Sequence, residues 1–421
     1  MFDISEIQFI SSKLDHSLLD EIVKKAFALN NLNVVDISTN SNSKKGDSYL
    51  STQCRITIKA KDENTSDDKF LYIFVKGLPE NLARRKTFRS VDFFANEVTF
   101  YNKVWPALHE FQMSKNVETF NNIPACYYAF ADGISDIVAL EDVSYKGFQG
   151  ISRSAGLDVR HATIILKLFA KFHGTSLAFK LQYLDKFEEI ANNLHETYFT
   201  EKFRSWYENF QKVNLKIVRD AIEKELPHIY LAQFDKIVSG DFFGNISKLC
   251  EKRGKFAVFT HGDAWVPNFL MKCDSNNVPL EGIMIDFQLL RTASLAQDIL
   301  FFLYACTTQE LRDEHWDSLI NDYYIELKDT LQKLGCDSNF ITLENVHNEL
   351  KDNALFGVGM TTEAVTMSIL DDDETANIDE LQGDDAHPLE KVWIIHPFKS
   401  QEKRLRICSI FKDAIDRGYL P

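Results

Sequence analysis

The spacing of apolar and polar residues divides the chain into a strand-rich first part and a helix-rich remainder. Residues 13–30 have the apolar spacing of a short amphipathic helix. Residues 51–60 and 69–77 are rich in β-type residues with partial alternation, and the charged run 61–68 separates them. This pattern predicts two antiparallel strands joined by a polar loop.

A second pair of strands is predicted after a long helix. Apolar residues lie near one side of the predicted helix Arg84–Leu108, and residues 126–143 have the pattern of another hairpin. The first part of the chain is therefore predicted to have the order strand, strand, helix, strand, strand.

Beyond Gly147 the apolar positions recur mainly at helical spacing. Long stretches of this kind cover residues 159–179, 199–226, 294–307 and 316–335. We therefore predict an α+β fold with two lobes, a small N-terminal lobe of β-sheet and helix at residues 1–145 and a large helical lobe at residues 146–421.

Charge and cysteine content narrow the class of protein. The 421 residues carry 47 Lys and Arg against 62 Asp and Glu, so the formal net charge is −15. A chain this acidic is a poor candidate for binding nucleic acid, which needs clustered positive charge. The seven cysteines are scattered without a CxxC pair, which argues against a disulfide framework and a structural zinc site.

The sequence contains no pattern typical of targeting or membrane insertion. The opening "MFDISEIQFISSKLD" carries acids and no long apolar run, unlike a signal peptide. No uninterrupted window of about 18 apolar residues is present. We therefore expect a cytoplasmic protein without a membrane partner, and no pattern indicates an obligate protein partner.

The segment "FTHGDAWVPNFL" (Phe259–Leu270) combines residue types that phosphoryl transfer requires. Asp263 and Asn268 stand five residues apart, the spacing of the protein-kinase pattern H-R-D-L-x-x-x-N. Asp286 ends a later apolar run and is followed by Phe287, as in the kinase D-F-G. A carboxylate can accept the proton of a nucleophile, and Asn and Asp oxygens suit Mg²⁺. A lone His-x-Asp is more often a polar turn, so the hypothesis depends on the combination.

A lysine and a glutamate upstream are candidate partners. Lys76 lies near the end of the predicted strand 69–77, and the predicted helix places Glu97 on the same face as Phe93, Phe94, Phe100 and Tyr101. An ionised glutamate on an aromatic face is costly unless it is paired. The order strand lysine, then helix glutamate, is that of kinases. The alternative is a glutamate at the edge of the apolar stripe with its head in water.

Two further segments are candidates for contact with a nucleotide. The polar stretch 43–52 contains Gly46 and Ser48 and could offer backbone N–H groups to phosphate oxygens. The stretch "VALEDV" contains Glu141 and Val143 and could place backbone groups against adenine. The alternatives are an ordinary polar loop and a strand end with a surface turn.

Three polar residues outside this set have expected structural roles. His173 lies on an apolar helix, where a hydrogen-bonded structural histidine is the better interpretation. Asp298 interrupts another apolar helix and is expected to bond nearby backbone or the Asp263 loop. His261 is expected to hold the shape of that loop rather than to act in chemistry.

Taken in order, three segments resemble a known family. "LEDVSYKGF", "FTHGDAWVPNFL" and "IDFQLLRTASLAQDILFFLY" resemble the ecdysteroid-kinase-like (choline-kinase-homologue) proteins of insects and nematodes. That family is similar to choline kinases and aminoglycoside phosphotransferases, and the resemblance implies their protein-kinase-like fold over nearly the whole chain. Gln288 in place of the D-F-G glycine fits the family pattern, whereas Pro267 and Ser48 replace residues that are usually Asn.

The resemblance implies ATP and Mg²⁺ as cofactors and assigns roles to motif residues. It implies that Asp263 is the catalytic base and that Asn268 and Asp286 bind magnesium. It implies that Lys76, paired with Glu97, contacts phosphate. The same comparison implies nucleotide contacts by the loop that contains Gly46 and Ser48 and by the backbone of Glu141 and Val143.

Two functions remain open from the sequence. The first is an ATP-dependent phosphotransferase that phosphorylates an alcohol group of a small molecule, for which the resemblance implies an ecdysteroid or a steroid-like xenobiotic. The alternative is a catalytically silent protein of the same fold that binds a small ligand or nucleotide. A protein kinase is disfavoured because the chain has no A-P-E segment after the Asp286 motif and no Gly-rich loop.

Overall fold

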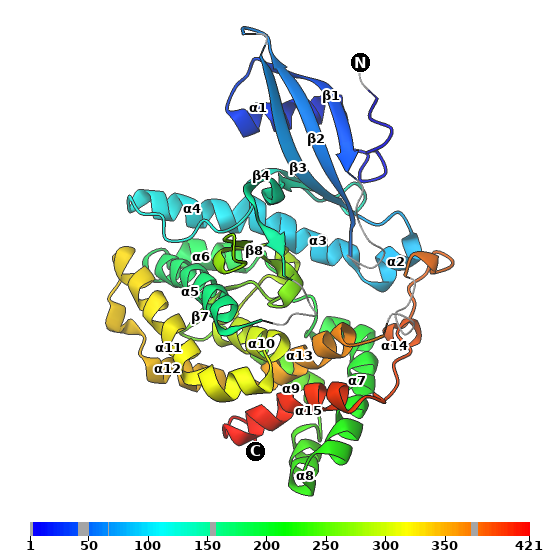
Figure 1. Ribbon diagram of the computed structural model, residues 1–421, viewed down its shortest axis with the longest axis vertical. Coiled ribbons are helices and arrows are strands. Elements are labelled where there is room, and N and C mark those ends of the chain that lie inside the picture. The colour runs from blue at the N-terminus through cyan, green and yellow to red at the C-terminus, as the bar shows by residue number, and fades with distance from the viewer. Residues whose placement is uncertain (1–2, 41–49, 66, 152–156, 372–377) are drawn as a thin grey trace. The chain divides into compact units, whose positions relative to one another are not determined.

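The computed structural model describes residues 3–40, 50–65, 67–151, 157–371 and 378–421. The chain forms two compact units. Unit 1 comprises Met1–Asn102, Ile123–Phe148 and Asn377–Pro388, and unit 2 comprises Lys103–Asn122, Gln149–Ala376 and Leu389–Pro421. The first contains an antiparallel sheet and the second is largely helical, which confirms the predicted α+β class (Figure 1).

The sheet of unit 1 has five antiparallel strands in the order β1-β2-β3-β5-β4. Their bounds are β1 Leu32–Asn40, β2 Thr52–Asp62, β3 Asp68–Gly77, β4 Cys126–Phe130 and β5 Ile137–Glu141. Both predicted hairpins are therefore confirmed. Alternate apolar residues such as Ile56 and Ile58 are buried with Leu19 and Ile22 of α1 (His16–Phe27), which covers one face of the sheet (Figure 1).

The predicted helix Arg84–Leu108 is not continuous, so this prediction is wrong in detail. It comprises α2 (Leu82–Thr87), α3 (Ser90–Thr99), a π-helical turn (Phe100–Val104) and α4 (Trp105–Ser114). The first break lies at Arg89, whose φ of 52° is left-handed. The π-helical turn precedes Pro106, which has no N–H to donate back along the helix.

Helices make up most of unit 2, and each predicted helical stretch overlaps one of them. Besides α4, they are α5 Val159–Gln182, α6 Leu184–Ala191, α7 Arg204–Glu225, α8 His228–Ile237, α9 Phe242–Glu251, α10 Ala296–Cys306, α11 Gln309–Lys333, α12 Leu343–Asp352, α13 Ala354–Ser368, α14 Leu389–Val392 and α15 Gln401–Asp416. Among the described residues, no helix is both long enough and apolar enough to span a membrane.

Two antiparallel strand pairs in unit 2 place the ends of two loops next to each other. Strand β7 (Ala257–Thr260) pairs with β10 (Arg291–Ser294), and β8 (Phe269–Cys273) pairs with β9 (Pro279–Met284) and with the short β6 (Gln149–Gly150). In this register Thr260 lies opposite Arg291, and Phe269 lies opposite Met284. The start of the loop 261–268 therefore lies beside the end of the loop 285–290, and its end lies beside the start of that loop.

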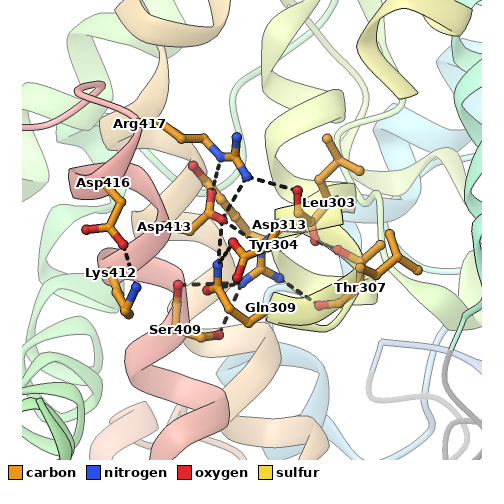
Figure 2. A network of polar contacts seen from close by, with 12 residues as sticks. Leu303, Tyr304, Thr307, Gln309, Asp313, Ser409, Lys412, Asp413, Asp416 and Arg417 are labelled. Atoms are coloured by element: carbon orange, nitrogen blue, oxygen red, sulfur yellow. Dashed lines mark hydrogen bonds and ion pairs between the residues drawn. The ribbon is translucent and has the colours of Figure 1, made fainter. Parts of the chain in front are cut away.

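The C-terminal helix α15 is joined to α10 and α11 by a buried polar network (Figure 2). The fully buried Arg312 donates to the Thr307 carbonyl at 2.7 Å and to Ser409 Oγ at 3.2 Å. Its Nε lies 3.4 Å from Asp413 Oδ1, and Arg417 donates to the other oxygen of that carboxylate at 2.7 Å. Arg417 Nη2 also donates to the Arg312 carbonyl at 3.0 Å. Because Arg312 bonds two side chains of α15 and accepts from Arg417, the network fixes α15 against the start of α11.

The chain passes between the units more than once. The acidic segment near residue 380 belongs to unit 1, where Asn81 Nδ2 donates to the Leu381 carbonyl and the His387 N–H donates to Thr87 Oγ1. Residues 103–122 belong to unit 2. The predicted division of the chain into two domains after residue 145 remains a proposal.

Candidate functional site

Asp263 and Asn268 meet in a tight turn between β7 and β8. The side-chain amide Nδ2 of Asn268 donates to the Asp263 carbonyl at 2.9 Å and to Asp263 Oδ2 at 2.8 Å. Pro267 lies in the single 3₁₀ turn Val266–Asn268 that brings the two residues together. With Nδ2 donating to Asp263, the amide oxygen of Asn268, which has lone pairs, is the atom that could bind a metal ion.

The backbone places Asp286 beside this turn. The N–H of Ile285 donates to the Asn268 carbonyl at 3.0 Å, which joins the two loops one residue before Asp286. The backbone of Asp286 is in the left-handed region, with φ 70° and ψ 69°. This conformation costs a non-glycine residue about 1–2 kcal/mol. The predicted triad of Asp263, Asn268 and Asp286 is therefore brought together within unit 2.

Burial raises the pKa of Asp263 to about 7, and the nearby charge of Asp286 adds to the effect. Hydrogen bonds from Asn268 and Gln288, and the positive charge of Arg291, act in the opposite direction and lower this pKa. The Gln288 contact is long, with Nε2 3.5 Å from Asp263 Oδ2. A carboxyl group with a pKa near neutrality is suited to accept a proton from a hydroxyl group.

His261 holds the loop together and is not placed as a base. Its ring is fully buried, Nε2 donates to the Ile285 carbonyl at 2.9 Å, and Nδ1 accepts from the Asp263 N–H at 3.2 Å. Both ring nitrogens are therefore used in the neutral form, and burial lowers the pKa of His261. This agrees with the structural role expected from the sequence.

Asp298 at the start of α10 anchors the same loop. Its carboxylate accepts the N–H of His261 at 2.6 Å and the N–H of Gly262 at 2.8 Å. The carboxylate also bonds His173 Nε2 at 3.0 Å, and His173 Nδ1 bonds the Tyr323 hydroxyl at 2.9 Å. The expected structural role of His173 and the expected link from Asp298 to the loop are both confirmed.

Gly262 is required by the backbone of this loop. Its φ is 82°, and a Cβ at this position would lie 1.9 Å from the Leu289 carbonyl oxygen. The loops 261–268 and 285–290 therefore approach each other more closely at Gly262 than any side chain would permit.

In unit 1, Lys76 and Glu97 form the predicted ion pair. Lys76 Nζ lies 3.0 Å from Glu97 Oε1 and 3.3 Å from Oε2, and both side chains are buried. Glu141 ends β5, next to β3, and its N–H donates to the Ala125 carbonyl at 2.8 Å. Val143 begins a 3₁₀ turn after that strand. Gly46 and Ser48 lie outside the described residues.

The sequence analysis missed three residues of this site. Gln288 and Arg291 lower the pKa of Asp263, and the Tyr323 hydroxyl bonds Nδ1 of His173. Arg291 carries the clearest signal, because an arginine inside an apolar stretch needs a partner. It finds one in Glu196, 95 residues earlier in the chain, at 2.6 Å.

The donor set fits magnesium with few protein ligands. No group of three or more His, Cys, Asp or Glu residues that could hold a metal occurs in the described parts of the chain. Asn268 and Asp286 supply hard oxygen atoms from adjoining loops. Magnesium characteristically takes one or two protein carboxylates and completes its shell with water and phosphate oxygens.

Several solved structures of phosphotransferases are similar to this chain at low sequence identity. An ethanolamine kinase of Plasmodium vivax is 13% identical, with a TM-score of 0.39, over 93% of this chain and 84% of that one. An aminoglycoside 2'-phosphotransferase-IIIa mutant in complex with GDP is 12% identical, with a TM-score of 0.37, over 83% and 90%. Choline kinase LicA from Streptococcus pneumoniae is 10% identical, with a TM-score of 0.31, over 84% and 92%.

No curated protein sequence matches the chain. A family model, described as the ecdysteroid kinase-like family, matches residues 45–336, which include both members of the Lys76–Glu97 pair and all of the Asp263 loop. Because this match covers more than half of the sequence, the chain belongs to the ecdysteroid kinase-like family.

Proposed function

We propose that the chain is a small-molecule kinase that transfers the γ-phosphoryl group of ATP to an alcohol group. Family membership supports a kinase-like phosphotransferase of small molecules. The observation that carries the finer proposal is the joined set of Asp263, Asn268 and Asp286, in which one carboxyl group has a pKa near neutrality.

In the proposed reaction Asp263 receives the proton of the substrate hydroxyl. The hydroxyl oxygen forms a bond to the γ-phosphorus, and the bond from that phosphorus to the bridging oxygen breaks, which releases ADP. Asn268 and Asp286 would hold Mg²⁺, which when bound neutralises charge on the phosphate oxygens. Lys76, oriented by Glu97, contacts the phosphates, while Gly46, Ser48, Glu141 and Val143 are proposed to contact the nucleotide.

The proposed acceptor is an ecdysteroid or a steroid-like xenobiotic, and the proposed location is the cytoplasm. The family description supports the first suggestion only by analogy. The acidic composition argues against binding of nucleic acid or of another strongly anionic partner.

Replacement of Asp263 tests the proposed role directly. With labelled ATP, magnesium and a panel of ecdysteroids, other steroid alcohols and phenols, Asp263→Asn should reduce turnover by about 10²–10⁴-fold. Glu344→Gln, an exposed position on α12, is the matched control and should leave turnover unchanged. Equal turnover by wild type and Asp263→Asn would refute the base assignment.

A calorimetric titration, read together with the transfer assay, separates the kinase from the catalytically silent alternative. The kinase should bind ATP only in the presence of magnesium, and Asp286→Ala should weaken that binding. Binding of ATP without any transfer to the whole panel would favour the silent ligand-binding protein.

A further inference from the structure

The two carboxylate oxygens of Asp263 have different surroundings. Oδ2 accepts from Nδ2 of Asn268 at 2.8 Å and lies 3.5 Å from Nε2 of Gln288. Oδ1 accepts no hydrogen bond from any residue in the described parts of the chain, yet it is not one of the solvent-inaccessible side-chain atoms that lack a partner. In this largely buried carboxylate, Oδ1 is therefore open to solvent and able to accept a proton.

A short turn presents Gln288 to Asp263. The 3₁₀ turn spans Phe287–Leu289, and both of its end residues are buried, whereas Gln288 is partly exposed. Successive side chains of a 3₁₀ turn point in directions about 120° apart, because the turn has three residues. The two apolar side chains therefore point into the core, and the amide group between them reaches the open side next to Asp263.

The backbone of this turn is held on both sides of the glutamine. The Phe287 ring packs against the His261 ring with centroids 4.7 Å apart. The Leu289 carbonyl oxygen approaches Gly262 so closely that a Cβ there would lie 1.9 Å away. These contacts fix the turn against the loop 261–268, so only side-chain torsions remain to adjust the distance between the amide and the carboxylate.

A second donor restricts the carboxylate of Asp263 more than Asn268 does alone. A carboxylate held by one donor can still turn about its last bond, because that torsion has no sharp minimum. The amide groups of Asn268 and Gln288 approach the same oxygen from two different loops. With both donors on Oδ2, the plane of the carboxylate is set and Oδ1 is directed to the open side.

The Gln288 contact is weak in the free protein, because 3.5 Å is at the outer limit of a hydrogen bond. Catalytic hydrogen bonds are often long before the reactants are bound and shorten afterwards. An interaction that strengthens only in the transition state lowers the barrier without tightening the binding of substrate. Loss of this contact is therefore expected to lower kcat and to leave KM unchanged.

We propose that Gln288 is a positioning residue that holds Oδ2 of Asp263, so that Oδ1 receives the proton of the acceptor hydroxyl. This inference rests on the proposed kinase function and deepens it to the level of single atoms. The O–H bond of the acceptor breaks, its proton goes to Oδ1, and the hydroxyl oxygen bonds the γ-phosphorus. The bond from that phosphorus to the bridging oxygen breaks, and its electron pair leaves with ADP. Gln288 itself neither gives nor takes a proton.

Two other roles for Gln288 make different predictions. If its amide oxygen Oε1 bound the acceptor directly, its removal would raise KM, because such a contact is made before the reaction begins. If it were only a polar surface residue, its removal would change neither constant. The positioning role is favoured because a carboxylate oxygen repels an amide oxygen, so the donor end of the amide faces Asp263.

Two replacements of similar length separate these roles. Gln288→Met removes both the donor and the acceptor, whereas Gln288→Glu keeps an acceptor oxygen and places a second negative charge beside Asp263. Assays use the panel member with the highest turnover. Gln288→Met should lower kcat by about 10–100-fold, as expected for one hydrogen bond to a charged group. Gln288→Glu should lower kcat at least as much, and neither variant should change the KM for ATP or for the acceptor.

A matched control keeps the test independent of folding defects. Gln332→Met changes an exposed glutamine on α11 and should alter neither kcat nor KM. The melting temperatures of both Gln288 variants should stay close to that of wild type, because the side chain is partly exposed. A loss of kcat at unchanged KM and unchanged melting temperature is a result that a merely structural role would not give.

Crystal structures of wild type and Gln288→Met test the positioning without turnover. The carboxylate of Asp263 should have one orientation in wild type, with Oδ2 toward the Gln288 amide, and more than one in the variant. A wild type that phosphorylates no member of the panel would refute the kinase proposal, whereas the two crystal structures would still decide the role of Gln288. The two failures are therefore distinguishable.

Three outcomes would overturn the positioning role. The first is an unchanged kcat in Gln288→Met. The second is a higher KM for the acceptor, at unchanged kcat, in Gln288→Met but not in Gln288→Glu, which would assign Oε1 to direct binding of the acceptor. The third is a single, unchanged orientation of the Asp263 carboxylate in the crystal structure of Gln288→Met.

Discussion

The ammonium group of Lys76 lies 3.0 Å from one carboxylate oxygen of Glu97 and 3.3 Å from the other, and both side chains are buried. Strand β3 supplies the lysine and helix α3 the glutamate. The pair neutralises two charges that would each be costly alone inside unit 1. Its value for stability and its value for catalysis can be separated by mutation.

Breaking and replacing this pair should have different consequences. Glu97→Leu alone should destabilise the protein by about 3–5 kcal/mol, because it leaves a buried lysine without its carboxylate. The double variant Lys76→Met with Glu97→Leu should recover most of that loss in urea unfolding but no phosphotransfer. Activity in the stable double variant would contradict the proposed phosphate contact of Lys76.

Removing Asp298 should impair the Asp263 loop without touching substrate. Asp298→Ala leaves the N–H groups of His261 and Gly262 without their acceptor, and each buried unsatisfied group costs about 1–3 kcal/mol. We expect a lower melting temperature and a lower kcat with little change in the KM for ATP. An increase in KM alone, at unchanged kcat, would show that Asp298 does not position the loop.

A methyl group at Gly262 should not be tolerated. Gly262→Ala combines a left-handed backbone with a Cβ 1.9 Å from the Leu289 carbonyl oxygen, so the two loops must separate. We expect loss of phosphotransfer and a lower melting temperature. Gly254→Ala, where a Cβ would meet no atom within 4 Å, is the matched control. Normal activity in Gly262→Ala would show that the close approach of the loops is dispensable.

The pKa of Glu363 predicts a pH dependence of stability. Burial raises the folded pKa of this α13 residue to about 7, above its ordinary value of 4.5, so between these values the native state binds more protons than the unfolded state. The contribution of Glu363 to the free energy of unfolding is therefore greatest below pH 4.5, declines as the pH rises to about 7, and is then constant. Urea unfolding of Glu363→Gln, compared with wild type from pH 5 to 8, should show a relative stabilisation that grows with pH. A difference independent of pH would contradict this prediction.

The network at the C-terminal helix predicts a large effect from one carboxylate. Asp413→Leu leaves the fully buried Arg312 without its anion, and we expect a loss of about 3–5 kcal/mol in the free energy of unfolding. Lys412→Ala on the same helix loses an exposed pair with Asp416 and should cost less than about 1 kcal/mol. Similar losses for both variants would show that the network does not fix α15.

The sequence predicted the elements of the fold where one periodicity dominates. Strands β2 and β3 alternate, and α5 and α11 bury apolar residues at helical spacing, so local pattern and tertiary burial agree. The interrupted region of α2, α3 and α4 was not predictable in this way. Its breaks depend on a left-handed Arg89 and a π-helical turn, neither of which changes the apolar periodicity.

The order of residue types along the chain determined the candidate chemistry. Asp263, Asn268 and Asp286 follow a spacing that phosphoryl transfer uses, and Glu97 lies on an aromatic face where an ionised carboxylate is costly unless it is paired. Tertiary structure alone decided which distant residues meet. Arg291 meets Glu196, His173 meets Tyr323, and Glu363 meets Tyr198 across long sequence separations. Periodicity carries no information on such contacts, because they depend on how packed helices and paired strands bring distant segments together, and the same packing sets the burial that raises the pKa of Asp263.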